Sequence, residues 1–101
     1  MKTLFLKVPL NEKILFTKHL SMMVKSGMTE IESVKLLARQ VKSKSFKTIL
    51  TTVVSDLENG QFLSKALRPY ERIFGNLFIS IINLGERSGT LGENLEFLSK
   101  D

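Results

Sequence analysis

Few side chains in this chain of 101 residues could do acid–base or nucleophilic chemistry. It contains no cysteine and a single histidine, His19. The lack of cysteine excludes disulfides, thiolate nucleophiles and cysteine-ligated zinc or iron–sulfur sites. One histidine is too few for a zinc catalytic site, and no Ser-His-Asp set, glycine-rich phosphate loop or catalytic pair of carboxylates occurs. The sequence therefore predicts a protein that is not an enzyme and requires no cofactor.

Two titratable side chains fall on or beside apolar helix faces. On a helical projection His19 lies within an apolar arc, which favours a hydrogen-bonded packing residue over a metal ligand or a catalytic base. Glu86 lies at the border of a second apolar arc. If it is buried, its carboxylate needs a cation or backbone amides as partners. The alternative is an exposed acid that pairs with Arg87 or Lys100.

The periodicity that must position these side chains is helical throughout, with no alternation long enough for a strand. Gly85 lies on the packed face of its helix, where a glycine costs about 1 kcal/mol relative to alanine, so we expect close contact with another helix. Capping boxes are predicted at residues 29–32 and 90–93. The expected fold is all-α, a compact six-helix bundle of antiparallel helical hairpins. The helices are expected at about residues 10–26, 29–40, 45–59, 63–67, 74–88 and 91–98.

Charge is unevenly distributed along the chain. Residues 1–47 carry ten Lys or Arg against three acids, whereas residues 48–101 carry five against seven. Such asymmetry is typical of a domain beside nucleic acid, phospholipid headgroups or an acidic partner, and it also occurs without electrostatic function. The run at residues 39–47 (RQVKSKSFK) could contact phosphates. A solvated turn is favoured, because the run has no stacking aromatic and no docking motif.

No segment of the sequence is predicted to span a membrane. The longest apolar stretch, residues 74–84, is interrupted by polar residues and is much shorter than the about 20 residues that a bilayer requires. Residues 1–7 resemble the start of a signal peptide, but Lys7 ends their apolar run. We therefore expect a soluble domain without an export signal.

Several motifs, in order and spacing, resemble the cytoplasmic domains of the inner-membrane platform proteins of type II secretion systems and type IV pili. The resemblance covers residues 14 to 99. Three departures fall at His19, at residues 28–30 and at residues 73–75, mostly at helix entries. The motifs are Phe16-Thr17, the helix end at Gly27, residues 34–40 (VKLLARQ), residues 60–67 (GQFLSKAL) and residues 85–91 (GERSGTL).

The resemblance implies a role for particular residues. Relatives are associated with self-association, and some of their cytoplasmic domains with calcium. Glu86 matches the motif carboxylate and would be the calcium ligand, with help from other oxygens, because calcium takes six to eight. The motif positions assigned to interaction are Gly27, Gly60, Gly85, Glu86, Ser88, Gly89 and Leu91.

The resemblance also implies a function, that of a non-enzymatic scaffold. Such platforms couple a cytoplasmic assembly ATPase to pilin or pseudopilin subunits at the bacterial inner membrane. The expected organisation is an N-terminal arm at residues 1–12 and a cytoplasmic helical domain at residues 13–101, truncated before a first membrane helix. The expected partners are the ATPase, the pilins, other assembly proteins and a second copy of the chain. The alternative is a basic helical domain that binds nucleic acid or another acidic partner.

Overall fold

The computed structural model describes residues 6–100 of the chain, and within that range every regular element is a helix. The expected all-α bundle is confirmed. Residues 1–5 of the predicted N-terminal arm lie outside the described residues, as does Asp101. The helices are α1 (Leu10–Lys25), α2 (Glu30–Gln40), α3 (Lys44–Glu58), α4 (Leu63–Leu67), η2 (Arg68–Tyr70), α5 (Glu71–Phe74), α6 (Asn76–Ser88) and α7 (Leu91–Ser99).

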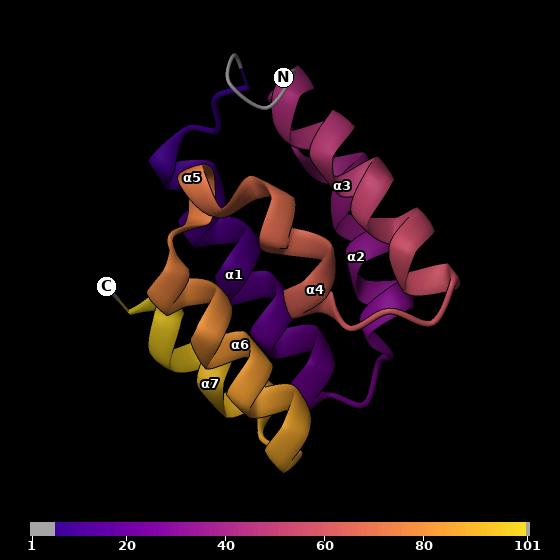
Figure 1. Cartoon of the computed structure of the whole chain (residues 1–101), viewed down its shortest axis with the longest axis vertical. Coiled ribbons are helices and arrows are strands. Elements are labelled where there is room, and N and C mark those ends of the chain that lie inside the picture. The colour runs from indigo at the N-terminus through magenta and orange to yellow at the C-terminus, as the bar shows by residue number, and fades with distance from the viewer. Residues whose placement is uncertain (1–5, 101) are drawn as a thin grey trace.

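Helix α1 lies at the centre of the bundle. It packs against α7 on one side and against α2 on the other, so that the α2–α3 and α6–α7 hairpins flank it (Figure 1). Phe16 and Leu20 of α1 are almost completely buried, and the ring of Phe16 meets that of Phe46 from α3 edge-on, with centroids 5.2 Å apart. The broad apolar arc of α1 therefore serves two interfaces at once.

The segment between α4 and α6 departs from the sequence prediction. No helix was predicted between residues 67 and 74, but residues 68–74 form the 3₁₀ turn η2 and the single turn α5. Pro69 is accommodated in the first turn, where no intrahelical N–H is required. Gly75 has a φ of 90° and separates α5 from α6, so α6 begins two residues later than predicted.

One predicted capping box is confirmed and the other is wrong. The Thr29 hydroxyl accepts from the Glu32 N–H at 3.1 Å, and the Glu32 carboxylate accepts from the Thr29 N–H at 3.2 Å. At the second site Thr90 makes no side-chain cap. Its N–H donates to the Gly85 carbonyl at 2.9 Å, in the C-terminal turn of α6, and is therefore not free to bind a Glu93 carboxylate.

No helix among residues 6–100 is long and apolar enough to cross a membrane.

Candidate functional site

Residues 85–91 form the tight turn between α6 and α7. Gly89 ends α6 in the left-handed conformation, with a φ of 75°, which a residue with a side chain rarely adopts. Gly85 is buried where the two helices approach each other. A Cβ atom on Gly85 would lie 2.9 Å from the Leu91 Cα and 3.0 Å from the Asn94 Nδ2. The predicted close helix contact at Gly85 is confirmed, and the backbone of Leu91 on α7 is what lies against Gly85.

The turn places the Glu86 carboxylate at the start of α4. Glu86 Oε2 accepts from the Leu63 N–H at 2.7 Å, and Oε1 accepts from the Ser64 N–H at 3.1 Å. The residue before α4, Phe62, offers no side-chain cap. The first N–H groups of a helix have no intrahelical acceptor, and Glu86 accepts from two of those of α4. Its negative charge is also stabilised by the positive end of the helix dipole. Asn83, one turn earlier on α6, donates to the Ser64 hydroxyl at 3.0 Å and reinforces the junction.

The partner of Glu86 is therefore backbone amides, which was one of the two arrangements that the sequence left open. The exposed alternative is wrong, since Glu86 is half-buried and forms no ion pair with a described residue. Lys100, one of its two candidate partners, lies 4.0 Å from Glu96 instead.

A second carboxyl group, that of Glu30 in the first turn of α2, faces Glu86. Burial of Glu30 raises its pKa from 4.5 to about 8, and the hydrogen bond to Glu86 and the repulsion between the two charges add to the shift. A proton shared between two carboxylates removes that repulsion. The raised pKa favours a protonated Glu30 at neutral pH, at the point where the start of α2 faces the junction of α4 and α6.

Glu30 and Glu86 line an open cleft of about 530 Å³. Helices α1, α2, α6 and α7 and the residue before α4 all contribute to it. The residues that line the cleft are Val24, Lys25, Glu30, Phe62, Gly85, Glu86, Gly89, Leu91, Gly92 and Glu93.

The structure brings together four of the seven motif residues that the sequence singled out, namely Gly85, Glu86, Gly89 and Leu91. Ser88, on the exposed side of α6, donates instead to the Leu84 carbonyl of its own helix at 2.8 Å. Gly27 and Gly60 do not line the cleft. Both have positive φ, 103° and 89°, in the turns that precede α2 and α4, so they position Glu30 and the α4 amides.

His19 is neither in the cleft nor hydrogen-bonded to a described residue, so the predicted hydrogen-bonded packing role is wrong in that respect. It is half-buried in a separate groove between α1 and α2. Sequence reasoning also missed Glu30, which it treated only as part of a helix start. A carboxylate in the first turn of a helix is so common that its position gave no signal of burial.

Comparison with known proteins shows the family to which the chain belongs. The family model described as "Type II secretion system (T2SS), protein F" matches residues 16–101. The chain belongs to the type II secretion system protein F family. The segments at residues 60–67 and 85–91 both lie within the matched residues, and the bonds from the Leu63 and Ser64 N–H groups to Glu86 join one to the other.

Individual relatives agree with this assignment. A type IV pilus assembly protein PilC of Thermus thermophilus is 32% identical over 90 residues, which are 89% of this chain and 22% of that protein. A type II secretion system protein F of Vibrio cholerae is 35% identical over 85 residues, 84% of the chain and 21% of the relative. A protein transport protein HofC homolog of Escherichia coli is 38% identical over 74 residues, 73% and 18% respectively. The chain thus spans about a fifth of the length of these relatives.

Proposed function

We propose that this chain is the first cytoplasmic domain of an inner-membrane platform protein, and that it acts as a non-enzymatic scaffold for pilus assembly or type II secretion. The observation that carries the proposal is the family match over residues 16–101, together with relatives named for those two machines. In this role the domain connects the assembly ATPase with pilin or pseudopilin subunits and with other assembly proteins.

The geometry of the cleft supports a scaffold rather than a reaction centre. The Glu86 carboxylate, to which the resemblance assigns a role, binds two backbone amides and so connects α6 to α4. A carboxylate engaged in this way is a structural cap, whereas a general base would need a substrate proton within reach. Helices that are held rigidly together by such contacts transmit force or rotation between partners bound to different faces of the bundle.

Deletion of the coding region for residues 6–100 in the source organism tests the proposal. We expect the deletion to abolish piliation or type II secretion, and the wild-type gene to restore it. A matched strain with Ser80→Ala, an exposed position on α6, should behave as wild type. Normal assembly in the deletion strain would reject the scaffold role. The relatives give no support to the alternative of a nucleic-acid-binding domain. Salt-dependent binding of the chain to a nucleic-acid duplex would support that alternative.

Calcium binding is a separate proposal that follows from the resemblance. Carboxylate oxygens are ligands that calcium prefers, and Glu30 and Glu86 line the same cleft. Calcium would have to displace the proton that the raised pKa of Glu30 favours. Residues 6–100 contain no group of three or more His, Cys, Asp or Glu arranged to hold a metal ion. One copy of the chain would therefore supply only part of the six to eight oxygens, and water or a second copy would supply the others.

Isothermal titration with Ca²⁺ tests this proposal, with Glu86→Ala and Glu93→Ala as the matched pair of variants in the same cleft. We expect heat from the wild type and from Glu93→Ala, and none from Glu86→Ala. Equal heats from the wild type and Glu86→Ala would end the proposal.

A further inference from the structure

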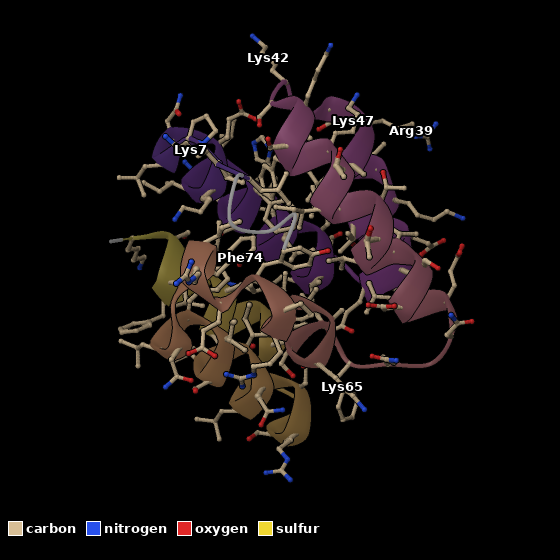
Figure 2. The ribbon with its side chains drawn as sticks, turned by 45° about the horizontal axis from the view of Figure 1, so that its top comes forward. Lys7, Arg39, Lys42, Lys47, Lys65 and Phe74 are labelled. Atoms are coloured by element: carbon tan, nitrogen blue, oxygen red, sulfur yellow. The ribbon has the colours of Figure 1, made fainter. Side chains whose placement is uncertain are left out.

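The turn between α2 and α3 forms a corner of the molecule with a high density of positive charge. Four exposed cations lie within nine residues there, and none forms an ion pair with a described residue. Figure 2 shows the labelled members of this set at the same end of the molecule, with their side chains directed into solvent. We call this set the basic corner: Arg39, Lys42, Lys44 and Lys47.

A groove of about 290 Å³ between α1 and the end of α2 opens beside the basic corner. Lys42 belongs to both features. Leu15, which is 52% exposed, projects from α1 into the groove, and the half-buried His19 lies one turn further along. The apolar side chains of the lining, Leu15, Phe16, Leu37 and Val41, form a trough with Lys42 at its end. The groove is lined by Asn11, Glu12, Leu15, Phe16, His19, Leu37, Gln40, Val41 and Lys42.

The one acidic side chain in the groove is already engaged by the backbone. Glu12 Oε1 accepts from the N–H groups of Lys42 and Ser43, each at 3.2 Å. These bonds hold the α2–α3 turn against α1. The cationic side chains of the corner form no ion pair with a described residue. The charge of the corner is therefore available to another molecule.

We propose that the α1–α2 groove and the basic corner bind an acidic segment of a partner protein that inserts an apolar side chain beside Leu15. Charge complementarity supplies the reason for an acidic segment. Lys42 lies at the groove, and the other cations of the basic corner, near the same turn, form no ion pair with a described residue. The concave, largely apolar lining supplies the reason for an anchor side chain, since such pockets hold the residues that dominate binding energy. A membrane surface would contact the lysines without filling the groove, and a nucleic acid has no side chain to fill it.

This surface lies apart from the Glu30–Glu86 cleft, and the two sites share no lining residue. The inference goes beyond the proposed scaffold role and does not depend on it. A binding experiment with the purified chain therefore tests it separately from any assembly assay.

The probe is a random dodecapeptide library displayed on phage and selected on the immobilised chain. We expect enrichment of peptides that combine several Asp or Glu with one or two of Leu, Ile, Phe or Trp. A synthetic copy of an enriched peptide, labelled with fluorescein, should bind with a Kd of about 1 to 100 μM in an anisotropy titration. Replacing its apolar residues with serine should weaken the binding about tenfold or more.

Two variants of the surface are compared with two matched controls, with circular dichroism as a check on folding. The double variant Lys42→Glu, Lys44→Glu reverses charge in the corner, and Leu15→Asp places a charge in the trough. Each should raise the Kd about tenfold or more, because it opposes the acidic peptide directly. The controls are Lys65→Glu on α4, far from the corner in Figure 2, and Leu77→Asp on α6, which is 71% exposed; each should change the Kd less than about twofold.

Several results would overturn the proposal. They are a selection without enrichment, enriched peptides without acidic residues, and peptides that bind the corner variant as well as the wild type. Sedimentation with vesicles of phosphatidylcholine and phosphatidylglycerol examines the membrane instead. Vesicle binding that requires the corner, in the absence of peptide enrichment, would make the surface a membrane contact. Loss of a homo-oligomer in the corner variant would make it a contact between copies of the chain.

Discussion

The carboxylate of Glu86 accepts the backbone N–H of Leu63 at 2.7 Å, although the two residues are 23 positions apart in the chain. A five-residue helix such as α4 has little stability of its own, because too few intrahelical hydrogen bonds form to offset its nucleation. An acceptor from another helix therefore decides where α4 begins. In this chain the Glu86 carboxylate, from residues 85–91, thus binds backbone amides of residues 60–67.

Removal of this acceptor is expected to destabilise the domain. Glu86→Ala leaves two amides at the start of α4 without a protein acceptor, which should lower the free energy of unfolding by about 1 to 3 kcal/mol. Glu86→Gln retains a carbonyl acceptor and should lose about half as much. Urea denaturation measures the change, and amide hydrogen exchange at Leu63 and Ser64 should accelerate.

Glu93→Ala is the matched control for the same experiment. Glu93 lines the same cleft but is exposed and makes no hydrogen bond or ion pair with a described residue. We expect a change within about 0.5 kcal/mol. A loss of stability in the control as large as in Glu86→Ala would show that the cap at α4 is not the cause.

The pH dependence of stability should report on Glu30. In the unfolded chain this carboxyl loses its proton near pH 4.5, whereas the folded protein retains it to about pH 8. The folded state binds more protons in this interval, so its stability declines as the pH rises from 4.5 through 8. Glu30→Gln should flatten the curve and raise the free energy of unfolding at the alkaline end by about 1 to 2 kcal/mol, a value reduced for partial exposure.

Chemical denaturation at a series of pH values gives this comparison, with Glu93→Gln as the control. Parallel curves for the wild type and Glu30→Gln would contradict a proton held between Glu30 and Glu86.

Gly85 is expected to tolerate no side chain. Gly85→Ala would place a Cβ 2.9 Å from the backbone of Leu91, and backbone cannot move aside as a flexible side chain can. The resulting strain should outweigh the higher helix propensity of alanine and lower the free energy of unfolding by about 1 to 3 kcal/mol. Thermal unfolding of this variant beside Ser80→Ala measures the difference. A more stable Gly85→Ala would mean that α6 and α7 are further apart than described.

The two threonines that resemble each other in sequence should behave differently when mutated. Thr29→Ala removes a hydroxyl that caps α2 and should lower stability by about 1 kcal/mol. Thr90→Ala removes no cap and should change stability by less than about 0.5 kcal/mol. Equal losses of stability in urea denaturation would show that Thr90 caps α7 as Thr29 caps α2, and would contradict the prediction.

The local features of the chain could be predicted from its sequence. Apolar periodicity determines the main helices, and Gly89 ends α6 as expected because a left-handed residue is easiest for glycine. Gly85 on an apolar face predicts a close helix contact, since only packing compensates for its low helix propensity. The second capping box failed because the Thr90 N–H binds the Gly85 carbonyl, and a four-residue pattern does not reveal that competitor.

The partners across the fold were decided by tertiary structure. The sequence established that Glu86 would need amides or a cation if buried, but it did not specify which. The turns at Gly27, Gly60 and Gly89 bring three distant segments to one cleft, and only there does Glu30 meet Glu86 and Glu86 meet the start of α4. Helix periods and caps depend on neighbours within about four residues, whereas burial and the pairing of charges depend on the packing of the whole bundle.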